Sequence, residues 1–152
     1  LGVRVVNLRI GLVLSREGGF LSQLLLPFKL FLGARIGSGA QWMSWIELGD
    51  LVRLIIYAME NDAMDGAVNA PAPSPVTNRN FTRALARALS RPAIFAIPAW
   101  LLTGLLGDVA RELLLASQRV IPERATNIGF AFKHPQLDGA LAHVLDTPAS
   151  RT

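Results

Sequence analysis

The stretch 37–56 constrains the fold more than any other part of the chain. It begins with a glycine turn, continues through residues 41–46, and ends in a run dominated by apolar residues. Side chains of an extended segment alternate between two faces, so Trp42 and Met43 should lie on opposite sides of a short strand. The apolar run that follows Asp50 has helical spacing. We therefore expect a turn, a strand and a helix, with the rest of the chain as their support.

The predicted helix is apolar except at four positions, three and four residues apart: Asp50, Arg53, Tyr57 and Glu60. These form one narrow polar stripe, so we expect the helix to be covered on most of its circumference. Asp50 is a good acceptor for the free N–H groups of a first helical turn. We assign it this structural capping role in preference to paired acid–base chemistry with Glu47.

The composition excludes several classes of site. With 152 residues, 51% hydrophobic and 17% charged, the chain is one ordinary core-rich domain or part of a larger one. The lack of cysteine excludes disulfides, thiolate metal sites and cysteine catalysis, and two histidines argue against a histidine zinc site. A net charge of +4 permits an anionic ligand but does not reach a nucleic-acid signature. The mean hydropathy of +0.38 predicts apolar surface that further sequence covers.

Strands alternate with helices along the chain, which predicts an α/β architecture with at least part of a parallel sheet. The β-branched run 3–14 is expected to be one buried strand. Further strands are expected at 67–70 and 93–97, and helices at 20–31, 77–91, 99–115, 122–129 and from 135 onward. We divide the chain into a Rossmann-like part at 1–92, a small C-terminal α/β module at 93–146 and a frayed tail at 147–152.

Nothing in the sequence predicts a membrane span or a targeting segment. The uncharged stretch 93–106 contains Pro98 and Gly104 and is shorter than the ~20 residues that a bilayer crossing needs. The chain has no initiator methionine, signal peptide or transit peptide, and Leu1 leads directly into the first apolar run. We therefore expect a cytoplasmic protein whose chain is entered midway.

Several polar and aromatic residues are candidates for a binding role. Arg9 lies in an apolar run, and because a buried guanidinium is costly it should meet a carboxylate, backbone carbonyls or an anionic ligand. Trp42 and Trp45 are expected to divide, with one in the core and the other at a ligand. Arg119 is either an anion donor or a plain surface arginine, and the sequence leaves both open.

Two further patterns have a structural interpretation beside the functional one. The arginines that recur every four residues from Arg79 to Arg91 could clamp phosphates, but a solvated helix face is favoured because no aromatic or glycine-rich partner accompanies them. The Gly37-Ser38-Gly39 turn precedes a strand, whereas phosphate-cradling turns open a helix. We therefore interpret it as a structural turn and expect no nucleic-acid partner.

Three motifs in order carry a family resemblance: Leu8-Arg9-x-Gly11-x-Val13-Leu14, Gly37-x-Gly39-x-Gln41-Trp42-Met43-Ser44-Trp45-Ile46, and Gly66-x-Val68-Asn69-Ala70. They resemble the C-terminal half of extended short-chain dehydrogenase/reductases, most closely the epimerase-like family labelled nucleoside-diphosphate-sugar epimerase. The stretch 98–145 looks like the small C-terminal module of that family, through Gln118-Arg119-Val120-x-Pro122 and Gly129-Phe130-x-Phe132. The resemblance implies an α/β fold that is the substrate-side portion of a Rossmann-like protein.

The family's redox motifs are absent from this chain. Extended members bind NAD(P) through a Gly-x-x-Gly-x-x-Gly turn and use a Tyr-x-x-x-Lys pair, and Tyr57, the single tyrosine, has Asn61 at the fourth position. The resemblance implies NAD or NADP in a full-length parent, with none bound to this chain alone. We expect no catalytic residue and no metal ligand here, and we leave open whether the intact protein is an epimerase, a dehydratase or a reductase.

The resemblance also indicates where a substrate would lie: against Gln41, Trp42, Trp45 and Arg119. Sugar-nucleotide epimerases have an Arg-x-x-Asn pattern where this chain has Arg9, and often an arginine where it has Met43. In this chain Leu12 stands in the place of the asparagine and Met43 in the place of the arginine. The exchange favours a more apolar small-molecule substrate. The alternative function is a non-catalytic module that binds a protein, or self-associates as a homo-oligomer, through exposed apolar surface.

Overall fold

The computed structural model describes residues 2–98, 100–101, 104 and 117–146. Its strands are β1 (Val6–Arg9), β2 (Leu12–Leu14), β3 (Ala34–Ile36), β4 (Trp42–Met43), β5 (Trp45–Glu47), β6 (Gly66–Asn69), β7 (Val76–Thr77) and β8 (Phe95–Ile97). Its helices are α1 (Gly19–Lys29), α2 (Leu48–Glu60), α3 (Asn78–Leu89), α5 (Glu123–Asn127) and α6 (Leu137–Asp146). The alternation of strands and helices is that of an α/β protein, as predicted.

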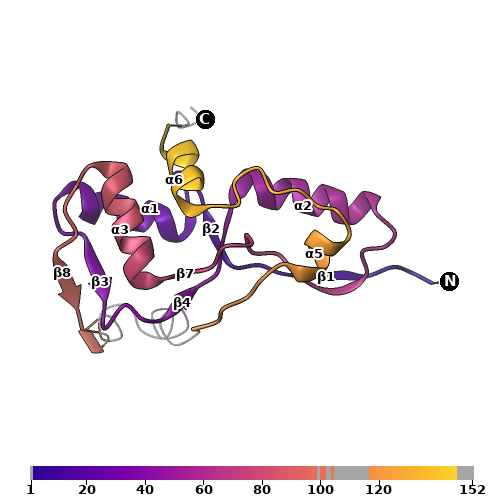
Figure 1. The fold of residues 1–152 in the computed structure, drawn as a ribbon, viewed down its shortest axis with the longest axis horizontal. Helices are drawn as coiled ribbons and strands as arrows, with labels where there is room; N and C mark the ends of the chain where they lie inside the picture. Colours follow the sequence, from indigo (N-terminus) through magenta and orange to yellow (C-terminus); the bar gives the residue numbers. More distant parts are fainter. Residues whose placement is uncertain (1, 99, 102–103, 105–116, 147–152) are drawn as a thin grey trace.

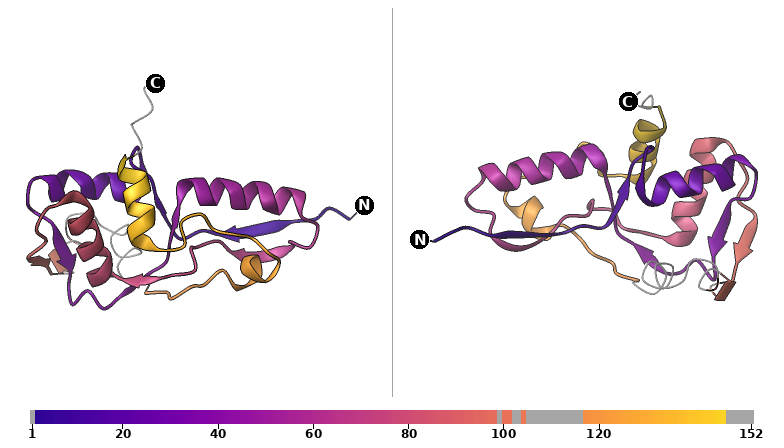
Figure 2. Two further views of the ribbon diagram at one scale, coloured as in Figure 1. Left: turned by 45° about the horizontal axis from the view of Figure 1, so that its top comes forward. Right: turned by 180° about the vertical axis from the view of Figure 1, so that it is seen from behind.

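The described strands form short pairs arranged along an elongated molecule (Figure 1). β1 pairs with β6, β2 with β5, and β3 with β8, all parallel, while β4 and β7 are antiparallel. The pair β1–β6 lies near α2 and α5 at one end, and β3–β8 lies near α1 and α3 at the other, as the two further views also show (Figure 2). The central strands β2 and β5 join the two ends.

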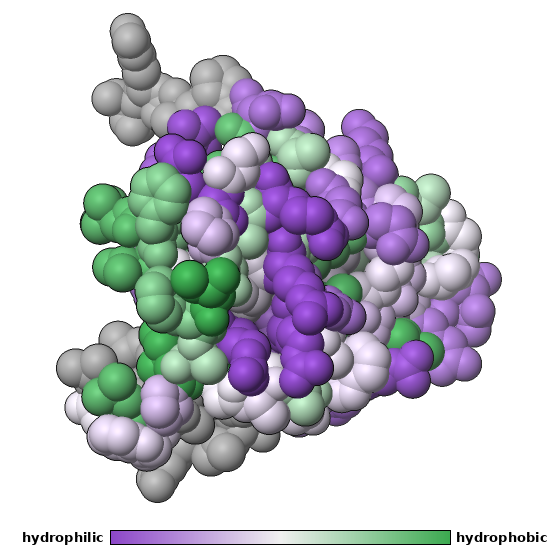
Figure 3. Space-filling view, turned by 60° about the vertical axis from the view of Figure 1, so that its left-hand side comes forward, coloured by the Kyte–Doolittle hydropathy of each residue, from purple (hydrophilic) through white to green (hydrophobic). Residues whose placement is uncertain are grey.

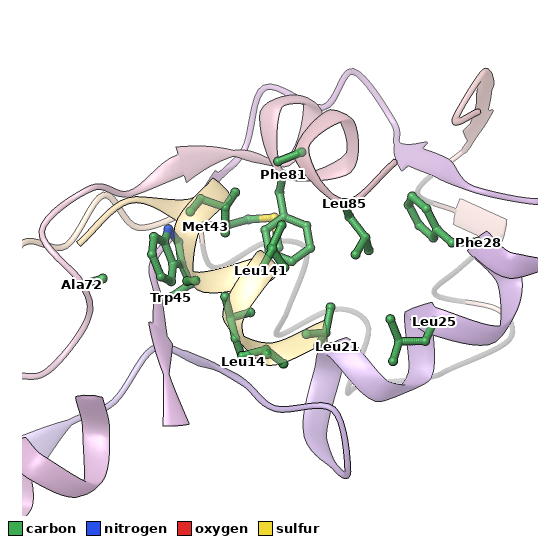
Figure 4. Close-up of a cluster of buried hydrophobic side chains, with 14 residues drawn as sticks. Leu14, Leu21, Leu25, Phe28, Met43, Trp45, Ala72, Phe81, Leu85 and Leu141 are labelled. Carbon is green, nitrogen blue, oxygen red and sulfur yellow. The ribbon is translucent and has the colours of Figure 1, made fainter. Parts of the chain in front are cut away.

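Strand β5 separates two hydrophobic clusters. Trp45 packs into one cluster and its neighbour Ile46 into the other, because successive side chains of a strand point to opposite faces. The first cluster joins α1, α3 and α6 to the central strands (Figure 4): Leu14, Leu21, Leu25, Phe28, Met43, Trp45, Ala72, Phe81, Ala84, Leu85, Leu137, Ala140, Leu141 and Val144. The second lies under α2: Ile46, Leu51, Leu54, Ala58, Met64, Val68, Ala70, Ala125 and Phe130.

The run 3–14 is two strands, and the prediction of one buried strand was wrong. The ladder of β1 with β6 ends at Arg9, and β2 starts a separate ladder with β5 at Leu12. Along β1 the side chains alternate between half-buried and exposed, and Arg9 is exposed. The expected burial of that guanidinium is therefore corrected, since Arg9 lies at the end of the strand and not within a core.

The helix α2 is covered on one side, not on most of its circumference. Leu51, Leu54 and Ala58 are buried. The opposite side leaves Val52, Ile56 and Met59 exposed to 47%, 48% and 72%. The prediction of a nearly enclosed helix fails because the described residues pack against only one face of it.

Glu47, and not Asp50, caps the start of α2. The Glu47 carboxylate accepts a hydrogen bond of 2.9 Å from the backbone N–H of Asp50. The Asp50 side chain turns instead toward the C-terminal segment and accepts from the N–H groups of Lys133 and His134, at 3.0 and 2.9 Å. It also pairs with Arg53. The capping role predicted for Asp50 is thus corrected to one of fastening a distant segment.

The polar stripe of α2 binds the segment that follows α5. Arg53 donates to the carbonyl of Ala131 at 3.1 Å, and the Tyr57 hydroxyl donates to the carbonyl of Ile128 at 2.6 Å. The Arg53 guanidinium also lies over the Phe130 ring. These contacts explain why a largely apolar helix keeps regularly spaced polar residues.

The helix α3 follows its sequence signals closely. Thr77 caps it by accepting from the N–H of Asn80, and the helix ends at Ser90, which adopts a left-handed conformation. α6 packs against α3 and contributes to the same cluster, so described parts of the two predicted domains share one core. Most of the helix expected at 99–115, and the tail at 147–152, lie outside the described residues, and the division at residue 92 stays a prediction.

No helix within the described ranges has the length and apolar character to cross a membrane.

Candidate functional site

A cavity of about 520 Å³ opens beside the carboxyl ends of the parallel strands β1 and β6. Ligands of open parallel sheets bind at this edge, where loops leave the strands. The lining residues come from four segments: Arg9, Ile10, Gly11, Leu12, Trp42, Met43, Ser44, Asn69, Pro71, Gln118 and Val120. The cavity thus gathers residues that are more than one hundred positions apart.

The floor of the cavity depends on a close approach of two backbones at Gly11. The N–H of Leu12 donates to the carbonyl of Ser44 at 2.8 Å, and a Cβ on Gly11 would lie 2.4 Å from that oxygen. Only glycine allows the strands to meet this way, because a real Cβ contact is never so short. Gly11 therefore shapes the cavity because it has no Cβ.

Ser44 interrupts the strand between β4 and β5 and fastens the segment 117–120 as a wall. Its hydroxyl donates to the carbonyl of Gln118 at 2.7 Å and accepts from the N–H of Val120 at 3.0 Å. The N–H of Trp42 adds a bond of 3.0 Å to the hydroxyl of Ser117. The wall is therefore held by the Ser44 hydroxyl, which both donates and accepts, and by the backbone N–H of Trp42.

Trp42 and Arg119 form a contact at the edge of this wall. Trp42 is half-buried and lines the cavity. The Arg119 guanidinium lies over its ring, 5.1 Å from the centroid, which is the geometry of a cation–π interaction. A planar apolar surface beside a guanidinium suits a ligand that has both a flat apolar group and a negative charge.

Among the described residues that line the cavity, Arg9 alone carries a charge. Its exposed side chain has no hydrogen-bond or ion-pair partner within the part of the chain that the structure describes. Asn69 stands opposite Arg9 in the β1–β6 register, so an amide adjoins the guanidinium at the cavity. A free guanidinium beside an amide can hold a carboxylate or phosphate oxygen.

Three of the four predicted substrate residues are not among those that line the cavity, and Arg119 adjoins it through its contact with Trp42. Trp45 is fully buried, and its indole N–H donates to the carbonyl of Ser74 at 2.9 Å. Gln41 turns toward β3 and donates to the carbonyl of Ile36 at 3.2 Å. The assignment of both residues to the substrate surface is corrected, since Trp45 lies on the strand face opposite Trp42.

Sequence reasoning missed Ser44, Asn69 and Gln118 as cavity residues. Asn69 carried a usable signal, because it lies next to the end of the strand predicted at 67–70, before a proline-rich loop. Gln118 carried none, since its position follows from a bond between Ser44 and a segment 74 residues away.

Metal ligands do not gather here: among the described residues no group of three His, Asp or Glu side chains could hold an ion. The rings of His134 and His143 stack at 4.4 Å without a carboxylate completing a site.

Known proteins resemble this chain in sequence. Residues 97–144 match a family model described as a domain of unknown function, DUF1731. Over 148 residues the chain is 41% identical to epimerase family protein ML0860 of Mycobacterium leprae. The match covers 97% of this chain and 48% of that protein. The chain therefore spans about half the length of the curated relatives it matches.

Solved structures give the same result. The crystal structure of human epimerase family protein SDR39U1 with NADPH has a TM-score of 0.88 at 38% identity, over 93% of this chain and 48% of that one. A nucleoside-diphosphate sugar epimerase from Corynebacterium glutamicum has a TM-score of 0.69 at 33% identity, over 93% of this chain and 26% of that one.

Proposed function

This chain belongs to the epimerase family of extended short-chain dehydrogenase/reductases, as the C-terminal half, and we propose that it forms the substrate-binding part of an NAD(P)-dependent epimerase or oxidoreductase. The observation that carries the proposal is the cavity at the carboxyl ends of β1 and β6. Its lining combines the Trp42 face with the free guanidinium of Arg9. A small molecule with an apolar or planar body and one anionic group fits that lining.

The cavity does not fit a dinucleotide by itself. Dinucleotide sites place the pyrophosphate at a helix N-terminus that follows a glycine-rich turn. Every residue that lines this cavity lies in a strand or a loop, and none belongs to a helix. NADPH is named in the structure of the human relative, whose chain is about twice as long. We infer that a nicotinamide nucleotide is held by the other half of the parent protein, and that this chain alone is inactive.

Two surfaces of the chain support a further half packed against it. In the described residues β1 pairs only with β6, so its other edge is open, whereas parallel strands occur in larger sheets covered on both faces. The exposed side of α2, which includes Val52, Ile56 and Met59, provides apolar area for such a contact. A preceding strand and helix would cover both surfaces.

In this proposal the chain's own residues bind and orient the substrate. Arg9 neutralises its anionic group, and Trp42 provides the flat wall that sets its direction. The nicotinamide cofactor, when bound, supplies hydride transfer. Among the described residues that line the cavity only Arg9 carries a charge, so the acid–base group must come from elsewhere in the parent.

The test joins this chain to the sequence that precedes it in its own gene. The longer protein and the 152-residue chain are both titrated with NADPH and with NADH while tryptophan fluorescence is recorded. Saturable quenching of the longer protein, and none of the shorter, is expected. Absence of quenching in the longer protein by either nucleotide would contradict the proposal.

The exposed side of α2 also favours a second candidate, a self-associating module without catalytic activity. Light scattering coupled to size exclusion separates the two. A longer protein that is monomeric and quenched by a nucleotide supports the enzyme part. The module is supported if the chain forms defined oligomers that the double substitution Val52→Ser with Met59→Ser abolishes, and if neither nucleotide quenches the tryptophan fluorescence of the longer protein.

A further inference from the structure

The helix α3 carries three arginines at intervals of four residues, Arg79, Arg83 and Arg87, and a fourth, Arg91, follows just beyond its end. Like charges at this spacing face the same side and repel one another. Of these four arginines, only Arg87 has a carboxylate partner in the described part of the chain: Asp138, at 3.0 Å. Both of these side chains are exposed. The positive charge of this face is therefore largely left without compensation.

A fifth arginine from another element joins the row. Arg35 of β3 lines a depression of about 250 Å³ together with Arg79, Thr82, Arg83 and Ala93. No carboxylate lines this depression. The sequence alone favoured a solvated helix face because no aromatic or glycine-rich partner accompanied the row. The fold adds Arg35 to the row and places the Gly37-Ser38-Gly39 turn beside α3.

Two of these guanidiniums are held in place by the Gly37-Ser38-Gly39 turn. Arg35 donates to the carbonyl of Gly37 at 2.5 Å, and Arg79 donates to the carbonyl of Ser38 at 2.9 Å. The turn itself is fastened to α3, because the N–H of Arg79 donates to the carbonyl of Gly39 at 2.9 Å. Since each guanidinium has five donors, both keep donors free for a ligand.

Gly39 allows this close packing. Its φ is +71°, and a Cβ there would lie 3.0 Å from the Cβ of Arg79. The third guanidinium, that of Arg83, has no hydrogen-bond or ion-pair partner among the residues described. Two fixed donors and one free cation thus converge on one depression.

A second depression of about 470 Å³ continues from the first. The two share Arg83 and Ala93, and the second adds Arg87, Ser90 and Arg91 with the apolar sides of Ala86 and Pro92. Figure 3 shows a strongly hydrophilic band that runs beside an apolar area on this end of the molecule. A ligand longer than a single anion would find space and further positive charge here.

We propose that Arg35, Arg79 and Arg83 form a binding site for a phosphoryl group, separate from the cavity at β1 and β6. Arginine presents a planar fork that matches phosphate oxygens, and three guanidiniums without a carboxylate suit a group with two negative charges. The second depression receives the rest of the phosphorylated molecule. The phosphoryl group belongs either to a free phosphoanion or to a lipid headgroup, and the two sources are separated below.

The first experiment uses inorganic pyrophosphate as the probe and isothermal titration calorimetry as the readout. Arg83→Gln is compared with Arg124→Gln, which removes the same charge from α5, where Arg124 pairs with Asp65. Arg83→Gln should weaken pyrophosphate binding about tenfold or more, since one charge-assisted pair is lost. Arg124→Gln should change it less than about twofold. Circular dichroism confirms that both variants remain folded.

The second experiment uses co-sedimentation with vesicles of phosphatidylcholine alone or with added phosphatidic acid. Binding that requires phosphatidic acid and is lost in Arg83→Gln but kept in Arg124→Gln identifies a headgroup as the source. Binding of pyrophosphate without vesicle binding identifies a free phosphoanion, and either result supports the site. Equal weakening by both variants, or no saturable binding of either probe, overturns it. Both results are independent of the nicotinamide titration.

Discussion

Gly11 and Ser44 approach so closely that a Cβ on Gly11 would lie 2.4 Å from the Ser44 carbonyl oxygen. That oxygen is also the acceptor for the N–H of Leu12 at 2.8 Å, so it cannot move away without losing the bond that joins β2 to the residue before β5. The relationship sets the floor of the candidate cavity and connects a single glycine in the sequence to the shape of the site.

Gly11→Ala should therefore destabilise the protein. The added methyl group meets backbone and not a flexible side chain, and such overpacking costs about 1–3 kcal/mol. Urea denaturation followed by circular dichroism measures the loss. Gly139→Ala is the control, because no atom lies within 4 Å of a Cβ there and the position is helical, so it should gain about 0.5–1 kcal/mol. A Gly11→Ala variant as stable as the wild type would refute the close approach.

Asp50→Ala should cost about 3–5 kcal/mol, because it removes a buried carboxylate, 1% exposed, that serves the Arg53 guanidinium and two backbone N–H groups. Thermal or urea unfolding gives the change in the free energy of unfolding. Asp62→Ala removes a fully exposed carboxylate near Arg4 and should leave that free energy unchanged within error. Equal effects of the two substitutions would show that Asp50 does not fasten the 133–134 segment.

The stability of the protein should depend on Trp45 far more than on Trp42 when each is replaced by phenylalanine. Trp45→Phe leaves the Ser74 carbonyl without its indole partner and opens space in the first cluster, at a cost of about 1–3 kcal/mol. Trp42→Phe keeps a flat wall on a half-buried position and should have little effect on stability. Urea midpoints of the two variants decide the matter, and the reverse order would contradict the assigned faces.

Arg4 should be required to keep the end of α2 closed. Its guanidinium donates to the carbonyls of Ala58 and Met59, which the helix end leaves free, and to the carbonyl of Met64 beyond it, at 2.7, 2.8 and 2.8 Å. Arg4→Lys keeps the charge but cannot reach all three oxygens with one ammonium, so a loss of about 1–2 kcal/mol is expected. Amide hydrogen exchange in the last turn of α2 should quicken, whereas Arg124→Lys should leave that turn as protected as before.

Part of the candidate site could be predicted and part could not. The alternation through residues 42–46 correctly divided Met43 and Trp45 from Ile46, because strand geometry is local. It could not decide which face would be the ligand side. That choice depends on the segment 117–120, which Ser44 holds against the Trp42 face.

The polar residues were harder still to assign. Glu47 and Asp50 lie three residues apart, and either could accept from the first turn of α2. The structure gives the cap to Glu47 because the N–H groups of Lys133 and His134 take the Asp50 carboxylate. A choice between two equivalent acceptors is settled by a segment more than eighty residues away.

By itself the sequence determined the α/β class, the start of α3 at Thr77, and membership of the epimerase family as its C-terminal half. These follow from short-range periodicity and from motif order. Only the tertiary structure decided that Arg9 is exposed at a cavity, that Trp45 is core, and that Arg35 joins the arginines of α3. Each of those outcomes depends on which distant backbone lies within hydrogen-bonding or van der Waals reach, and sequence spacing carries no information about such contacts.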